Sequence, residues 1–119
     1  MIDQALMQKS KSGDTDAMRQ LAMAYMQNKD LENAIKWIGE AALQGNVEAM
    51  ADMADMYRHS RQMDKAFSWE EEAANNGRVL SMYNLSVCYR DGLGVSKSKE
   101  MHRYWYNKAV QNGLANYQK

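Results

Sequence analysis

Apolar residues recur along the chain at the spacing of one helix face. Near the N-terminus, four of them stand at positions i, i+4, i+5 and i+8, and a second set follows at i, i+3 and i+7. The two sets are Ala17, Leu21, Ala22 and Tyr25, and then Ala34, Trp37 and Ala41. A period of about 3.6 residues predicts two amphipathic helices, each with one apolar stripe.

This two-helix pattern repeats every 32 residues. Glycines and tyrosines recur at that interval, and tryptophans follow at intervals of 32 and 36: Gly13, Gly45 and Gly77; Tyr25, Tyr57 and Tyr89; Trp37, Trp69 and Trp105. A helix pair of this kind buries its apolar stripes only by stacking on neighbouring pairs. The sequence therefore predicts an all-α fold, an α-solenoid of three helix-turn-helix repeats with the tryptophans in its core.

We expect one domain over residues 1–119, with an N-terminal capping helix at 1–12, repeats at 13–44, 45–76 and 77–112, and a truncated end at 113–119. The predicted helix pairs span 14–27 and 31–44, 46–59 and 63–75, and 78–91 and 98–111. An exposed docking peptide is the alternative for 1–12. The apolar C-terminal edge would be covered by a second copy of the protein, by a partner, by further repeats, or by Leu114 and Tyr117 folding back. Because the middle repeat contacts neighbours on both sides, Trp69→Ala is expected to destabilise the fold more than Trp105→Ala.

The repeated residues carry a family resemblance over about Gly13 to Gly113. Gly-x-x-x-Ala, then Leu-(Ala/Gly/Ser)-x-x-Tyr, then Lys-Ala-x-x-Trp-x-x-x-Ala-Ala-x-x-Gly resembles the Sel1-like repeat, which is close to the tetratricopeptide repeats. The third unit has the Gly92-Leu93-Gly94-Val95 loop typical of that family. The first two units lack the loop, and the third has Met101-His102 where Lys-Ala is usual. The resemblance implies a right-handed solenoid and adaptor or scaffold work in signalling, secretion or quality control.

Composition narrows the class of protein and the cellular compartment that we expect. Proline is absent and the net charge is zero, which suits a continuous helical stack and argues against a general nucleic-acid binder. The single cysteine, Cys88, excludes the intrachain disulfides that clamp helix pairs in several Sel1-like proteins, and this fits a reducing compartment. The sequence shows no signal peptide and no apolar run long enough for a membrane span. We therefore expect a soluble, cytoplasmic protein, unless processing has removed a leader.

Charge is unevenly distributed along the chain. Residues 45–76 hold three Lys or Arg against seven Asp or Glu, whereas residues 77–119 hold seven against two. Runs such as Glu70-Glu71-Glu72 are expected on solvated outer helix faces. The functional alternative is steering of a charged partner, or head-to-tail self-association of the acidic and basic parts.

The sequence predicts no enzyme, no cofactor and no metal site. It has no His-Glu-x-x-His, Cys-x-x-Cys or Gly-x-Ser-x-Gly motif. His59 and His102 stand 43 residues apart without clustered ligands, and Cys88 is expected to be a packing residue. The competing class is enzymatic, since some Sel1-like proteins are linked to cell-wall or β-lactam compounds.

A partner is expected to bind in the concave groove that the first helices of successive repeats line in tetratricopeptide-like stacks. The residues of these helices outside the apolar stripe are the candidate contacts: Arg19, Met23, Met26, Glu48, Asp55, Arg58, His59, Leu80, Tyr83, Val87 and Arg90. Tyr83, Arg58 and Arg90 are the expected hot spots, because tyrosine and arginine are enriched at such positions. The predicted function is thus a protein–protein interaction module, either an adaptor or scaffold. Two alternatives are a bacterial immunity or antitoxin protein that blocks a toxin, and binding or hydrolysis of a β-lactam-like small molecule. A homo-oligomer through the C-terminal edge is also expected as an option.

Overall fold

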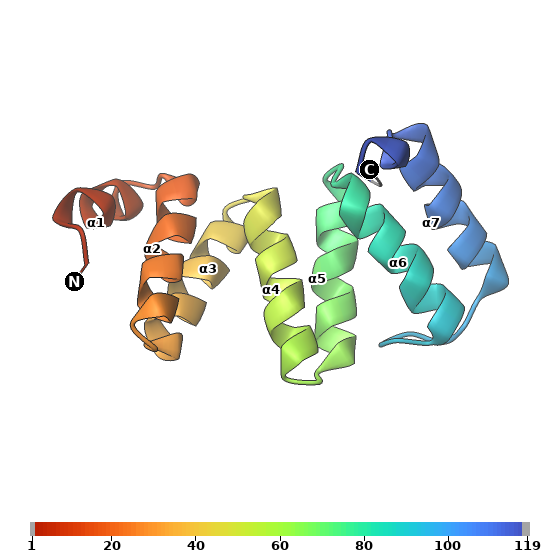
Figure 1. Ribbon diagram of the computed structural model, residues 1–119, viewed down its shortest axis with the longest axis horizontal. Coiled ribbons are helices and arrows are strands. Elements are labelled where there is room, and N and C mark those ends of the chain that lie inside the picture. Colours follow the sequence, from red (N-terminus) through yellow and green to blue (C-terminus); the bar gives the residue numbers. More distant parts are fainter. Residues whose placement is uncertain (1, 118–119) are drawn as a thin grey trace. The chain divides into compact units, whose positions relative to one another are not determined.

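The computed structural model describes residues 2–117, which form seven α-helices and a C-terminal 3-10 helix, with no strand (Figure 1). The elements are α1 (Gln4–Lys11), α2 (Thr15–Gln27), α3 (Leu31–Leu43), α4 (Val47–His59), α5 (Met63–Asn75), α6 (Val79–Asp91), α7 (Lys99–Gln111) and η1 (Leu114–Tyr117). The all-α repeat fold and its capping helix are confirmed. The first residue of the predicted capping segment, and residues 118–119 of the predicted end, lie outside the described residues.

Short polar side chains begin most of the helices. Asp14 accepts a hydrogen bond from the Ala17 backbone N–H at 3.0 Å, and Asn46 accepts one from Ala49 N–H at 2.9 Å. Asp30 and Ser98 do the same at the starts of α3 and α7. Each such bond satisfies a donor that the first helical turn leaves without a partner.

The chain divides into two compact units, residues 1–53 and 54–119, with the border inside α4. In the first, α1 and α3 both pack on α2. The buried residues of α2 and α3 are the alanine-rich stripes expected from the sequence: Ala17, Met18, Leu21 and Ala22 with Ala34, Ile38, Ala41 and Ala42. Small side chains let the two helices approach closely. On α1, Ser10 is buried and its hydroxyl donates to the Leu6 carbonyl at 2.9 Å.

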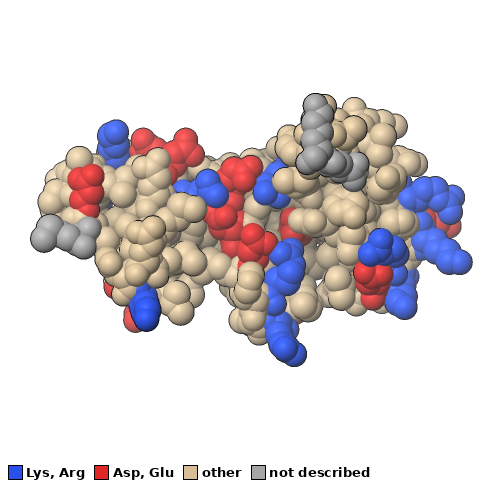
Figure 2. Space-filling model, in the orientation of Figure 1, with Lys and Arg blue, Asp and Glu red and all other residues tan. Residues whose placement is uncertain are grey.

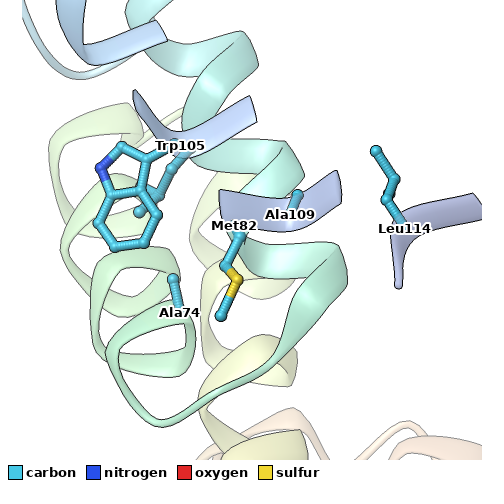
Figure 3. Packing of buried hydrophobic residues seen from close by; sticks show 6 residues of the cluster. Ala74, Met82, Trp105, Ala109 and Leu114 are labelled. Atoms are coloured by element: carbon cyan, nitrogen blue, oxygen red, sulfur yellow. The ribbon is translucent and has the colours of Figure 1, made fainter. Parts of the chain in front are cut away.

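In the second unit, α6 packs against both α5 and α7. Its core gathers Ala74, Met82, Leu85, Trp105, Ala109 and Leu114 (Figure 3). The α6–α7 loop runs against the start of α5, where a Cβ on Gly94 would lie 2.2 Å from the Met63 carbonyl oxygen. Since Gly94 also has a φ of +74°, only glycine fits this loop without strain.

The C-terminal edge is partly covered by the chain itself. Leu114 is buried in the core of the second unit, as the folding-back alternative predicted, but Tyr117 stays exposed. The predicted tryptophan core is only partly confirmed: Trp105 is 5% exposed, whereas Trp37 and Trp69 are half-buried. The burial of Trp105 removes the basis for expecting Trp69→Ala to be the more destabilising change.

None of the helices within residues 2–117 is long and apolar enough to cross a membrane.

Candidate functional site

The first part of the predicted groove lies on α2 and α4 of the first unit. Met23 and Met26 are exposed large apolar residues of α2, and Glu48 is exposed on α4. Arg19 donates from Nε and Nη2 to Asp52 of α4, at 2.5 and 3.3 Å. This hydrogen bond and the charge of Asp52 raise the pKa of Arg19. Arg19 therefore ties α2 to α4, in addition to any role at a surface.

In the second unit, Arg58 lies between two carboxylates. Its Nη1 donates to Asp55 at 2.5 Å and its Nη2 to Glu70 of α5 at 2.6 Å. Glu70 is only 1% exposed, so the expectation of a solvated Glu70 was wrong. Its second oxygen, Oε1, has no hydrogen-bond partner among the described residues. The two carboxylates hold the half-exposed guanidinium of Arg58 in one orientation.

The sequence does carry a signal for this buried glutamate. The residue that follows the tryptophan is Ile38 in the first repeat and Glu70 in the second. Ile38 is buried, and its apolar side chain in this slot is the one indication that its counterpart Glu70 is also covered. The partner needed to stabilise that charge is Arg58, which stands where the first repeat has Met26. An apolar pair of positions in one repeat is therefore an ion pair in the next.

The remaining predicted contacts of the second unit form a stripe along one side of α6, which we term the α6 face: Leu80, Tyr83, Val87 and Arg90. Leu80 and Arg90 are exposed, while Tyr83 and Val87 are half-buried. Arg90 donates from Nε and Nη2 to Asp91 at 3.0 and 3.1 Å, and this bond raises the pKa of Arg90. All three predicted arginines are thus already engaged with carboxylates.

Aromatic residues of α7 extend this stripe. The Tyr106 ring lies 6.4 Å from the ring of Tyr83 and 6.2 Å from that of His102. His102 is itself fixed, because its Nδ1 lies 2.8 Å from the Ser86 carbonyl oxygen of α6. Tyr106 and His102 are not among the predicted partner contacts, since both belong to the second helix of their repeat.

Lys and Arg side chains gather over the turn between α6 and α7 (Figure 2). The exposed basic residues there are Arg90, Lys97, Lys99 and Arg103. This part of the second unit presents a positive surface beside the α6 face.

The side chains that could take part in catalysis, those of His59 and Cys88, lie in environments typical of structural residues. His59 is exposed, with Nδ1 2.8 Å from the Asp55 carbonyl oxygen. Burial and the charge of Glu70 raise the pKa of Cys88, although the charge of Arg58 opposes them. A nucleophilic thiol needs the opposite shift. Within residues 2–117, no group of three His, Cys, Asp or Glu residues is arranged to hold a metal ion.

The structure thus brings the predicted residues together in two sets. Asp55, Arg58 and His59 join one network at the end of α4, in the same unit as the α6 face. Arg19, Met23, Met26 and Glu48 belong to the first unit. A single groove that includes both sets stays a prediction.

The chain consists of antiparallel helix pairs that recur at a fixed sequence interval, and their outer faces vary in polar and aromatic residues. These features define an α-helical repeat protein. The Sel1 repeat matches residues 15–46, 47–77 and 79–114, and the chain belongs to the Sel1 repeat family. Proteins built from Sel1 repeats generally mediate protein–protein interactions.

Solved structures agree with this assignment. A Sel1 repeat protein from Oxalobacter formigenes superposes with a TM-score of 0.84 at 31% identity, over 92% of this chain and 89% of that one. A protective antigen present in uropathogenic Escherichia coli strains, which displays an SLR fold, gives 0.75 at 28% identity, over 87% of this chain and 24% of that one. A sel1 repeat protein from Klebsiella pneumoniae subsp. pneumoniae, with a TM-score of 0.67 at 21% identity, covers 91% of this chain and 53% of its own and shares the fold. No curated protein matches the chain at a significant level.

Proposed function

We propose that this protein is a non-catalytic interaction module that binds a segment of a partner protein along the α6 face, next to Arg58. The observation that supports this most is the arrangement of Arg58. Its guanidinium is held by Asp55 and Glu70, in the same compact unit as the exposed and half-buried apolar side chains of the α6 face. A side chain that is already ordered loses less entropy when a partner binds.

The chemistry of the α6 face indicates what the partner segment offers. Leu80 and Val87 stand seven residues apart on one helix side, so they can contact two apolar side chains of the segment. The remaining N–H groups of Arg58 and Arg90 suit hydrogen-bond acceptors on the same segment. Together they favour a short amphipathic or extended segment with two apolar anchors.

A catalytic role finds less support in the geometry. The raised pKa of Cys88 keeps its thiol protonated at neutral pH, and both histidines are hydrogen-bonded to backbone carbonyls. The toxin-blocking and β-lactam alternatives are favoured by no specific arrangement of residues.

The test is affinity capture of the tagged protein from lysate of its source, compared with two variants. Leu80→Ser/Val87→Ser alters the α6 face and leaves the residues of the buried core unchanged. Leu43→Ser/Val110→Ser is the matched control, because both residues are exposed and apolar but lie elsewhere, on α3 and α7. All three proteins are first shown to be equally helical by circular dichroism.

We expect one partner to be captured by the wild type and by the control variant, and to be lost with Leu80→Ser/Val87→Ser. A partner that persists with the α6 variant would contradict the proposal. So would equal loss with both variants, because this would indicate general apolar adhesion.

A further inference from the structure

A cleft with a volume of about 320 Å³ lies in the first unit, between the α1–α2 turn and α3. One side is formed by the end of α1 and the turn, the other by the exposed side of α3, and the main lining residues are Lys11, Gly13, Met18, Lys36, Trp37 and Glu40. Its volume is at the lower end of the range for small-ligand sites, roughly 300–1,000 Å³. We refer to it as the Trp37 cleft.

The equivalent place in the third repeat is closed by the protein's own side chains. Trp105 packs with Ala74 and Met82 (Figure 3). The Lys108 ammonium lies 5.4 Å from the centre of the Trp105 ring, and Tyr104 meets that ring edge-on at 5.2 Å. An indole in this position is therefore covered by a cation and an aromatic ring.

In the first repeat, the residues that would close the site are different. Lys36 stands where the third repeat has Tyr104, and Glu40 stands where it has Lys108. Across residues 2–117, no cation or ring stacks on Trp37. The half-buried indole is left as an open wall of the cleft.

The charges at the rim indicate the ligand. Lys11 and Lys36 are exposed and form no ion pair with any described residue. The single acidic group, Glu40, accepts a hydrogen bond from the Gln44 side-chain amide at 2.7 Å. The rim thus carries an excess of positive charge, which attracts an anion, while the indole offers a flat apolar surface.

We propose that the Trp37 cleft binds a carboxylate that sits next to a flat apolar group. The occupant is a partner segment in which an acidic residue or a C-terminal carboxylate neighbours an aromatic side chain. This inference does not depend on the α6 face, because the cleft lies in the first unit and the α6 face in the second. Either site can be lost without the other.

Three small molecules of one shape serve as probes: 3-phenylpropanoate, 3-phenylpropylamine and 3-phenylpropanol. Binding is followed by NMR through the three indole N–H signals, which are assigned with single Trp→Phe variants. We expect the carboxylate to shift the Trp37 signal with about millimolar affinity, as suits a fragment of this size. The amine should bind more weakly than the alcohol, and the Trp105 signal should not move because that indole is covered.

Two variants test the chemistry. Lys11→Ala/Lys36→Ala should weaken binding of the carboxylate by about 2- to 5-fold per lysine. The control, Lys99→Ala/Arg103→Ala, removes the same charge from exposed positions on α7 and should leave binding unchanged. Lys36→Tyr/Glu40→Lys copies the third repeat and should cover Trp37, which abolishes the shift.

The proposal is overturned if the carboxylate leaves the Trp37 signal in place, if the amine binds as tightly as the carboxylate, or if the lysine variant matches its control. A Lys36→Tyr/Glu40→Lys protein that is folded and still binds the carboxylate would also overturn it.

Discussion

The buried ion pair between Arg58 and Glu70 provides the sharpest test of how this repeat protein is stabilised. The first repeat has Met26 and Ile38 in the same two slots. We therefore consider Arg58→Met and Glu70→Ile, singly and together, so that the double variant gives the second repeat the residues that the first already accommodates.

The expected magnitudes follow from the burial of each partner. Arg58→Met leaves Glu70, at 1% exposure, without its cationic partner, and removal of one member of a buried pair costs about 3–5 kcal/mol. The Arg58 side chain is 38% exposed, so water can reach the site and we expect the low end, about 3 kcal/mol. Glu70→Ile alone leaves Arg58 hydrogen-bonded to Asp55 and should change stability by about 1 kcal/mol or less. The double variant should be neutral, or more stable by about 1 kcal/mol, since apolar replacement of a whole buried pair is tolerated.

The four proteins are compared by urea denaturation and by thermal unfolding, both followed by circular dichroism. A loss of about 3 kcal/mol should lower Tm by roughly 12 °C for a chain of this size. The reasoning is refuted if Arg58→Met costs less than about 1 kcal/mol, or if the double variant is no more stable than Arg58→Met. The cycle also guides binding studies, because a single substitution of Arg58 would mix lost recognition with lost stability.

Three further outcomes are expected. Trp105→Ala should lower the free energy of unfolding by about 3–5 kcal/mol in urea denaturation, and clearly more than Trp37→Ala, since of these two indoles only that of Trp105 is fully packed. Equal losses would contradict this. A positive φ at Gly94 and Gly45 costs any other residue roughly 1–2 kcal/mol, but only a Cβ on Gly94 would meet a backbone oxygen. Gly94→Ala should therefore destabilise by about 2 kcal/mol more than Gly45→Ala; similar Tm values would count against the close approach. Because its pKa is raised, Cys88 should react with iodoacetamide more slowly than a peptide thiol at pH 8, and its rate should rise only at more alkaline pH; a rate matching the peptide would be inconsistent with burial.

The sequence predicted the helices closely because their ends are encoded locally. The predicted 63–75 helix has the bounds of α5, and the other five predicted repeat helices differ by only one residue at an end. The left-handed glycines after α1, α3 and α5 mark these ends within a few positions, and so do the capping residues Asp14 and Asn46 that follow two of them. Because the pattern recurs at a fixed interval, the helix bounds predicted for one repeat can be applied to the others.

The environment of the polar and aromatic residues was harder to predict. Arg19 finds its partner 33 residues away, on the first helix of the next repeat. Trp105 is covered by Lys108 and Tyr104, whereas Trp37 in the same slot has neither kind of cover. A repeat pattern gives the slot of a residue, but the neighbours that fill the space around it come from other helices and differ between repeats.

The residue after each tryptophan shows what this divergence achieves. In order along the chain it is buried Ile38, buried Glu70 with its partner Arg58, and exposed Tyr106 against Tyr83. The alanine and glycine positions around this slot keep the helices at the same spacing, so its chemistry can change without loss of the fold. Variation in such slots places an ion pair, an open indole cleft and an aromatic stripe on one scaffold. Recognition by this protein should therefore differ between its repeats, and exchange of a whole repeat should remove one surface while the others continue to bind.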